Sequence, residues 1–453
     1  MFGCHLGKLF QATVAGGSYQ ESLISVVQGA PAGLYISEQE IYGDLLLRKP
    51  GADELSSPRK EPDLPVIVTG LNSDDTIEGA ANKNHTNGTP ISILIANLDR
   101  HLIHVQQYQQ TNRTPRPGHA SYASFVKYGP NDDAVGAGIF SGRYTSTIVA
   151  AGYIAKKILE KCGIRVFSYC KEMAGVKCSE IAYEDIYTST QRYKKMRHDF
   201  DPFYQQIYVN RRIHMEMRLL EKMAVLAQIE QEIDRIRGLA PVLKPEQVCD
   251  KYGVHHVINC PDWKAAQEML EECNRITMTG DSSGGIVEVV ALGVPAGLGE
   301  PVFDKLDAEL GRMLGIGAVK GVEVGAGFAV KNMTGYQSND QMHSVQGKIS
   351  FDSNNAGGIT GGLSTGQPIV VRMAVKGTPT IAKPQHTIDK YTMENKQLAA
   401  ITRRDPTIVG RIWPIAENYT AMVLLDHLLA HYGYQTLCSK MNVNAKEMDS
   451  PSK

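Results

Sequence analysis

Residues 281–328 read "DSSGGIVEVVALGVPAGLGEPVFDKLDAELGRMLGIGAVKGVEVGAGF". Within them the run "GIVEVVAL" lies between two glycine-rich turns, and "PVIVTGL" (65–71) and "QPIVVRMAV" (367–375) have the same character. Short runs rich in β-branched residues and bounded by glycines are typical of strands joined by tight turns. The stretch therefore predicts antiparallel sheets.

Two helices are expected on either side of this stretch. "TSTIVAAGYIAKKILEKCG" (145–163) has apolar residues at helical spacing, a basic last turn and a glycine stop. "PIAENYTAMVLLDHLLAHYG" (414–433) repeats that design, with proline at its start and glycine at its end. Strands and helices together predict an α+β protein.

A charged, glycine-poor segment spans residues 190–245. Its apolar residues alternate at spacings of three and four, which predicts an amphipathic helix with a coiled-coil-like seam. The seam residues are Leu226, Ile229, Ile233 and Ile236. The helix can dock on its own domain or serve as a partner-binding arm, and the sequence leaves both open.

The composition narrows the class of protein. The 453 residues carry a net charge of −1, with 42% hydrophobic and 21% charged residues, so no general attraction to nucleic acid or to an anionic membrane is expected. No run of 18 apolar residues and no signal peptide is present in the sequence. The eight cysteines include no CxxC pair, which favours reduced thiols in the cytoplasm and no metal site.

Four short stretches combine ionisable groups with stiff or glycine-rich backbone: "LRKPG" (47–51), "RPGHASYA" (116–123), "KGTPTI" (376–381) and "RRDPTIVGR" (403–411). The second presents His119 to a ligand, or holds an ordinary histidine. The last could bind phosphate through arginines and keep Asp405 as a base, or form a solvated turn. "KGTPTI" offers hydrogen-bond donors to a phosphate, or forms an exposed strand end. "LRKPG" by itself could be any basic surface turn. No Rossmann or P-loop spacing occurs.

The order and wording of these blocks together resemble the chorismate synthase family. Besides residues 281–328, the blocks "RPGHASYASFVKYG" (116–129) and "NNAGGITGGLSTGQPI" (354–369) carry the resemblance, as do "RRDPTIV" and "PIAENYTAMVLLDHLL". It implies a β-α-β sandwich of two antiparallel four-stranded sheets with helices, assembled as a homotetramer. Residues 1–440 would form this single domain, with 190–245 inserted as a charged helical arm and 441–453 as a flexible tail.

The resemblance also implies an activity: the 1,4-anti-elimination of phosphate from 5-enolpyruvylshikimate 3-phosphate in the shikimate pathway, with reduced FMN as cofactor. Asp405 matches the aspartate that helps remove the C6 proton, and His119 matches the histidine that protonates reduced flavin. The positions matching the flavin-binding residues are Ser141, Gly317, Ala318, Gly361, Lys376, Thr378, Thr380 and Arg403.

On the substrate side the resemblance assigns phosphate binding to Arg48, Lys49 and Arg143. Tyr19 stands where the family motif G-E-S-H-G has the histidine that protonates the departing phosphate. Other positions that depart from the family pattern are Leu47, Glu54, Ile139, Tyr144, Ile148 and Arg404. The phosphate side therefore differs from the family more than the flavin side does.

Three functions are consistent with this pattern. The protein performs the family reaction, or it is a flavin enzyme retuned to another substrate, or it is a non-catalytic paralogue with a structural or regulatory role. The first is favoured because the retained groups include His119, Arg143, Arg403 and Asp405.

Overall fold

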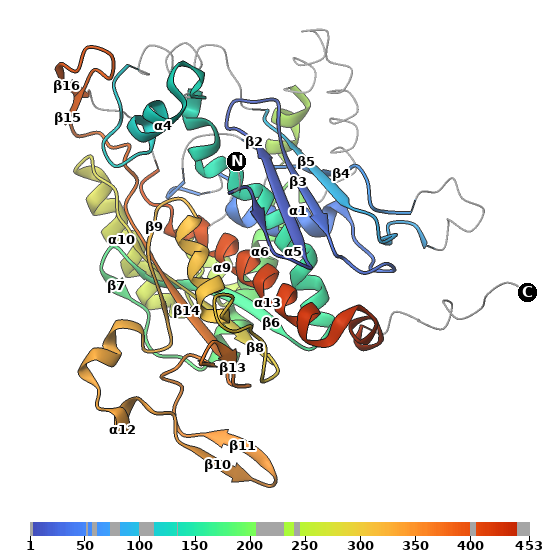
Figure 1. The fold of residues 1–453 in the computed structure, drawn as a ribbon. Coiled ribbons are helices and arrows are strands. Elements are labelled where there is room, and N and C mark those ends of the chain that lie inside the picture. The colour runs from blue at the N-terminus through green and yellow to red at the C-terminus, as the bar shows by residue number, and fades with distance from the viewer. Residues whose placement is uncertain are drawn as a thin grey trace, which may run out of the picture.

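The structure is a computed structural model that describes residues 3–50, 53–56, 61–72, 82–98, 113–133, 135–204, 231–239, 245–398 and 405–441. Two five-stranded sheets, antiparallel throughout, form its outer layers (Figure 1). The first has the order β1-β2-β3-β5-β4, and the second β7-β6-β8-β14-β9. The strands are β1 His5–Leu6, β2 Gln11–Gly16, β3 Ser22–Gln28, β4 Pro65–Ile67, β5 Ile91–Ala96, β6 Arg165–Met173, β7 Val176–Lys177, β8 Gly285–Leu292, β9 Val319–Val324 and β14 Ile369–Val375.

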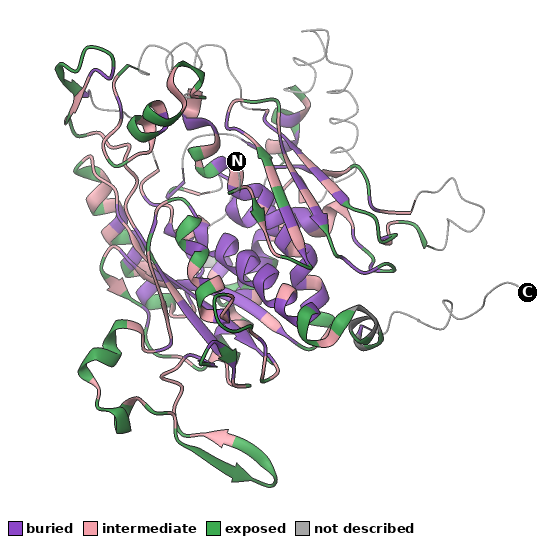
Figure 2. Cartoon of the chain, viewed as in Figure 1, coloured by how far each residue is buried: buried purple, intermediate pink, exposed green. Residues whose placement is uncertain are grey.

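Helices fill the space between the sheets. Helix α13 packs on β6 and β8 and also on α5, which in turn contacts β3 and β5. Because α13 is enclosed on all sides, its first six turns are buried almost without interruption, as Figure 2 shows. The helices are α1 Glu38–Arg48, α4 Ser121–Tyr128, α5 Thr145–Lys161, α6 Tyr183–Phe200, α9 Pro245–Tyr252, α10 Trp263–Met278, α11 Leu306–Gly311, α12 Gly335–Ser338 and α13 Val409–Lys440.

The predicted sandwich of antiparallel sheets and helices is confirmed, with one difference in strand number. Each sheet has five strands instead of four, because the edge strands β1 and β7 add two residues each. The second predicted helix begins at Val409, where the Thr407 hydroxyl accepts the Val409 N–H at 3.2 Å, so Pro414 lies inside it. Its expected stop is found at Gly433, where φ is 71°.

Both ends of the charged 190–245 segment that the structure describes pack on the domain. Helix α6 contacts α1 and β6, and residues 231–237 are helical with Ile233 and Ile236 buried. The Lys194 ammonium on α6 reaches the Glu417 carboxylate on α13 at 2.5 Å, within the core. Leu226 and Ile229 lie outside the described residues, as do 205–230 as a whole and most of the predicted tail.

Short hairpins and single turns complete the chain. A segment that contains α12 and the β10–β11 hairpin projects from the sandwich and is largely exposed (Figures 1 and 2). In the parts of the chain that are described, no helix is long and apolar enough to span a bilayer. The remaining elements are β10 Met342–Val345, β11 Lys348–Phe351, β12 Ile359–Thr360, β13 Leu363–Ser364, β15 Gln385–Ile388, β16 Asn395–Leu398, η1 Gly129–Asn131, η2 Val135–Phe140, η3 Gly142–Tyr144, η5 Arg312–Gly315 and η6 Gly327–Asn332.

Candidate active site

The turn that follows β14 joins three segments that are distant in the sequence. The Lys376 ammonium donates to the Gly118 carbonyl, and the Lys376 N–H donates to the Ala318 carbonyl at 3.0 Å. The Thr378 hydroxyl donates to the main-chain carbonyl of Asp405 at 2.8 Å. The residues of the proposed flavin side, contributed by four different elements, therefore meet at one end of the second sheet.

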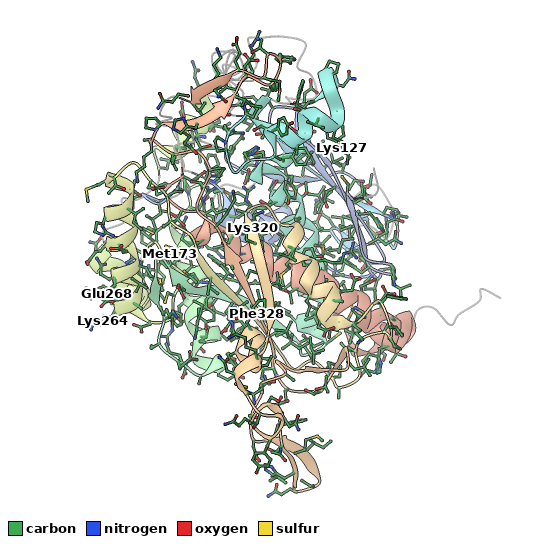
Figure 3. The ribbon with its side chains drawn as sticks, turned by 60° about the vertical axis from the view of Figure 1, so that its left-hand side comes forward. Lys127, Met173, Lys264, Glu268, Lys320 and Phe328 are labelled. Atoms are coloured by element: carbon green, nitrogen blue, oxygen red, sulfur yellow. The ribbon has the colours of Figure 1, made fainter. Side chains whose placement is uncertain are left out.

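Lys376 lies close to another cation. Partial burial and the ammonium of Lys320 hold the pKa of Lys376 below its usual value. Lys320, which is labelled in Figure 3, lies on β9, the neighbour of β14 in the sheet. Two adjacent cations repel each other and attract an anion, so this edge of the sheet is suited to a negatively charged ligand.

His119 stands on a turn that requires glycine. Gly118 has φ +70°, and a Cβ there would lie 3.3 Å from the Lys376 amine, so a side chain would strain the turn and crowd the lysine. Burial, together with the charges of Arg116 and Lys376, lowers the pKa of His119 to about 4. The His119 Nδ1 atom is buried and has no hydrogen-bond partner among the residues that the structure describes. The site thus holds a neutral imidazole with one unused polar atom.

We expect His119 to remain neutral through the whole range in which ordinary histidines titrate. Its folded-state pKa of about 4 lies below the value near 6.5 in an unfolded chain, so unfolding takes up a proton between these values and stability falls as the pH drops through them. Imidazole resonances in ¹H–¹⁵N NMR spectra should show no titration of His119 between pH 5 and 8. A His119 midpoint above 6 would contradict the assignment.

A second hairpin holds the His119 loop in place. The Thr387 hydroxyl on β15 donates to the Pro115 carbonyl at 2.5 Å, and the Arg113 guanidinium pairs with the Asp389 carboxylate at 2.9 Å. In the same area, the Arg116 guanidinium donates to the Thr380 hydroxyl at 3.2 Å. Thr380 therefore also supports the His119 loop. The loop and the hairpin lie around the labels α4, β15 and β16 in Figure 1.

The loop after β2 carries Tyr19, whose ring lies next to the main chain of Gly136. A Cβ built on Gly136 would come within 2.3 Å of the Tyr19 ring. The Ser18 N–H donates to the Gly138 carbonyl at 3.2 Å, while the Asn97 amide donates to the carbonyls of Gly17 and Gln20 at 3.0 and 2.7 Å. Hydrogen bonds from two neighbouring segments thus hold the loop.

Arg143 and Arg48 meet at one buried carboxylate. Asp63 is 0% exposed and pairs with both guanidinium groups, with Arg48 at 3.0 Å. Arg143 also donates to the Asn97 side-chain carbonyl at 2.8 Å and lies 3.6 Å from the Glu61 carboxylate. Because Asn97 also holds the Tyr19 loop, the ion cluster and that loop form one unit.

Three residues that are close in sequence to Arg48 or Arg143 have other partners. Lys49 pairs with Asp201 and donates to the Tyr42 hydroxyl at 2.8 Å, in a separate buried cluster. The Ser141 hydroxyl caps η3 by accepting the Arg143 N–H at 3.3 Å. The Tyr144 hydroxyl accepts the Gly317 N–H at 3.3 Å and donates to the Gly315 carbonyl at 3.1 Å. Tyr144 therefore connects the loop that carries Arg143 to the turn before β9, in which the Ala318 carbonyl accepts the Lys376 N–H.

The structure brings together most, but not all, of the residues singled out in the sequence. Gly361 lies in the turn between β12 and β13, at the end of β14 opposite to Lys376, so within one chain it is about 20 Å away. Arg403 lies outside the described residues. The residues that the structure connects through the contacts above are Tyr19, Arg48, His119, Ser141, Arg143, Gly317, Ala318, Lys376, Thr378, Thr380 and Asp405.

Several residues of this network were not assigned a role from the sequence. Glu61 and Asp63 stand on either side of Pro62 in the block "KEPD". Two carboxylates so close together, next to the apolar run "LPVIV", are a sequence signal for buried partners of arginine. Asn97 carries no comparable signal, because its contacts are made with segments that lie elsewhere in the sequence.

An end of an antiparallel sandwich that combines cations, a neutral imidazole and a carboxylate is suited to an enzyme that acts on an anionic ligand by proton transfer. The chain belongs to the chorismate synthase family, whose sequence profile matches residues 10–429. The resemblance inferred from the sequence is thereby confirmed.

Individual relatives match over nearly the full length. The chorismate synthase of Acetivibrio thermocellus is 35% identical over 460 aligned positions, covering 98% of both chains. That of Methanosarcina mazei is 37% identical over 430 positions, covering 95% of this chain and 97% of its own. A crystal structure of chorismate synthase superposes on 98% of this chain and 99% of its own, with a TM-score of 0.63 and 21% identity, and it supports the fold.

Proposed function

We propose that this protein is a chorismate synthase, a phosphate lyase that converts 5-enolpyruvylshikimate 3-phosphate to chorismate and inorganic phosphate with reduced FMN. The observation that carries the proposal is the meeting of His119, Lys376 and Asp405 at one end of the sandwich. In the reaction the C6–H bond and the C3–O bond of the substrate break, and no net oxidation occurs. Assembly as a homotetramer and a cytoplasmic location are part of the same proposal.

The residues present fit a flavin. An anionic, hydrogen-bonding cofactor would find the cations of Lys376 and Arg116 at its phosphate or ring oxygens, and the unused Nδ1 of His119 as a partner. When bound, reduced FMN supplies electron density to electron-poor carbon atoms of the substrate. The neutral imidazole of His119 can accept or return a proton at Nδ1, and Asp405 can take the C6 proton.

The proposal is tested by anaerobic turnover with reduced FMN and 5-enolpyruvylshikimate 3-phosphate, with phosphate release as the readout. Phosphate release together with the absorbance of chorismate supports it. Tight binding of reduced FMN with no phosphate release from this substrate would reject it. Growth of a strain that lacks chorismate synthase, complemented with this chain on medium without aromatic supplements, is the matching test in cells.

A second function, that of a flavin enzyme for another substrate, is favoured by one observation. The buried carboxylate of Asp63 already neutralises Arg48 and Arg143, and Lys49 is paired with Asp201. Cations that already have buried partners contribute less to binding a phosphate group. Reduced-FMN binding by a protein that leaves the family substrate intact would support this function.

Tyr19 provides a direct test of the phosphate side. A phenol with a reference pKa near 10 is a weaker acid at neutral pH than an imidazolium near 6.5. If protonation of the leaving phosphate limits the rate, Tyr19→His should raise phosphate release by about 10²-fold, the effect of one positioned acid. The assay compares it with the parent and with Tyr122→His, which changes an exposed tyrosine on α4.

The double variant Tyr19→His, Gln20→Gly extends this comparison to the adjacent residue. An increase in rate that requires both changes would assign the limitation to the whole loop. Unchanged or lower rates in both variants would show that Tyr19 does not limit the release of phosphate.

A further inference from the structure

Arg411, in the first turns of α13, forms an ion pair with Asp405. This pairing was not predicted from the sequence. The Arg411 Nη2 atom contacts the Asp405 carboxylate, and the side chains of Arg411 and Asp405 are 15% and 26% exposed. The Arg411 N–H donates to the Ile408 carbonyl at 3.0 Å. The guanidinium is therefore carried by the rigid start of a helix and not by a loop.

Other contacts hold the main chain of Asp405, while Arg411 contacts its carboxylate. The Thr378 hydroxyl donates to the Asp405 carbonyl at 2.8 Å, and the Ser283 N–H donates to the Pro406 carbonyl at 3.0 Å. Two hydrogen bonds from different segments thus set the path of the chain at this point. The orientation of the carboxylate itself is a separate matter, because rotation about χ1 and χ2 moves its oxygens without moving the main chain.

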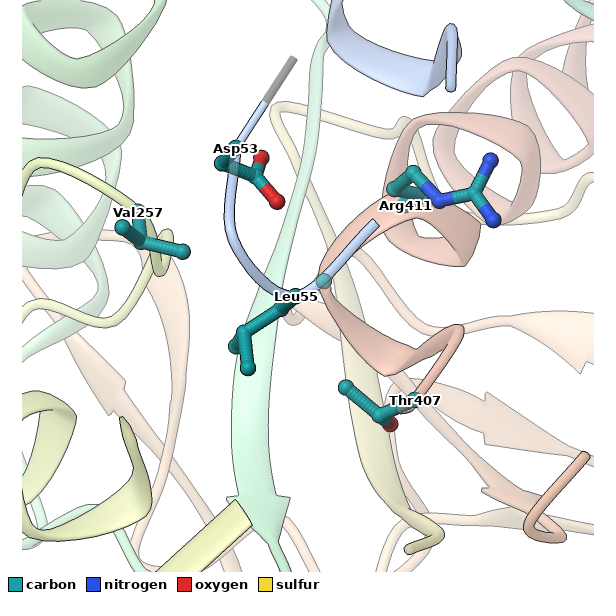
Figure 4. Close-up of a pocket in the computed structure, with 6 residues that line it drawn as sticks. Asp53, Leu55, Val257, Thr407 and Arg411 are labelled. Carbon is teal, nitrogen blue, oxygen red and sulfur yellow. The ribbon is translucent and has the colours of Figure 1, made fainter. Parts of the chain in front are cut away.

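The Arg411 side chain also borders a small hollow, lined by Asp53, Leu55, Val257, Thr407, Gly410 and Arg411, and its guanidinium is directed away from Asp53 and Val257 (Figure 4). The Nε–H of Arg411 is buried and has no acceptor within the described parts of the chain. Across the hollow, the Asp53 carboxylate accepts from the Arg197 guanidinium at 3.3 Å. A guanidinium whose sole purpose is to stabilise the fold would be expected to use its buried donors more fully.

We propose that Arg411 is a positioning residue that holds the Asp405 carboxylate in the orientation needed to take the substrate proton. The proposal rests on the proposed function for Asp405 as a base. A displacement of the base by about 1 Å from the reacting atom can cost about 10²-fold in rate, so a fixed partner on a helix has a direct effect on turnover.

The test is the variant Arg411→Ala, assayed for phosphate release beside the parent. We expect kcat to fall by about 10²-fold, with KM changed by less than about threefold, because Arg411 acts through Asp405 and not on the substrate. Added guanidinium ion should restore part of the lost kcat. The matched control is Arg275→Ala, which removes an exposed arginine paired with Glu272 on α10 and should leave both parameters unchanged.

Two further experiments separate the proposal from misfolding of the variant and from failure of the proposed function: a conservative variant and a double-mutant cycle. Arg411→Lys keeps the charge without the planar guanidinium, and its kcat should lie between those of the parent and Arg411→Ala. In flavin-free protein, the shifts of the unfolding midpoint for Arg411→Ala and Asp405→Asn should be non-additive, since the two side chains are in contact. The measurement of unfolding midpoints does not require the protein to turn over a substrate.

Three results would overturn the proposal: a higher KM with unchanged kcat, no rescue by guanidinium, or additive midpoint shifts. If the parent itself releases no phosphate while the midpoint shifts are non-additive, the proposed function fails and the contact between Arg411 and Asp405 stands. The two failures are thus distinguishable.

Discussion

Asp405→Asn is expected to lower the rate of phosphate release by about 10²–10⁴-fold, the contribution typical of a positioned general base. The amide has nearly the shape of the carboxylate but cannot accept a proton at neutral pH. The main chain at this position is held by Thr378, so the loop should keep its course in the variant. Stopped-flow or steady-state phosphate release under anaerobic conditions measures the effect.

The control for this experiment is Asp352→Asn, which changes an exposed aspartate next to β11 and away from the site. Reduced-FMN affinity, followed by flavin fluorescence, should differ little between Asp405→Asn and the parent. If Asp405→Asn turned over at a rate within a factor of three of the parent, Asp405 would not be the base.

Asp63→Asn is expected to be the most destabilising single change in the site, by about 3–5 kcal/mol, because it leaves the buried guanidinium groups of Arg48 and Arg143 without their shared carboxylate. Asparagine is the appropriate replacement, since Asp63 has φ +55° and asparagine tolerates the left-handed region. Urea unfolding followed by circular dichroism measures the change in the free energy of unfolding.

An exposed ion pair provides the reference for this prediction. Asp281 pairs with Lys383 at the surface, and Asp281→Asn should change stability by no more than about 0.5 kcal/mol. A loss below about 1 kcal/mol in Asp63→Asn would mean that the buried arginines do not depend on Asp63. The flanking carboxylate of Glu61, 3.6 Å from Arg143, would then be the partner to remove next.

The sequence was sufficient to predict the local elements and the family. Helix α5 and the strand β8 follow from apolar spacing and glycine turns, since helical and extended periodicities are local properties of the chain. The start of α13 was not predicted correctly. Pro414 is typical of the first turn of a helix, but the residue that caps α13 is Thr407, seven residues earlier. The edge strands β1 and β7 are too short to give a periodic signal.

The residues of the site were named from the sequence more readily than their partners. His119, Lys376 and Asp405 stand in short blocks that the resemblance identifies, whereas their partners come from segments up to 258 residues away, as in the contact between Lys376 and Gly118. The low pKa of His119 also depends on tertiary structure, since it arises from burial and from Lys376 on a different segment.

The sequence by itself determined the antiparallel α+β sandwich, the family and the identity of the ionisable groups, because hydrophobic periodicity, glycine turns and ordered motifs are written along the chain. Only the tertiary structure decided which of these groups are paired. Asp63 neutralises Arg48 and Arg143, and Arg411 holds Asp405. The physical reason is that charge pairing and desolvation depend on distances of a few ångströms between side chains, which folding alone sets.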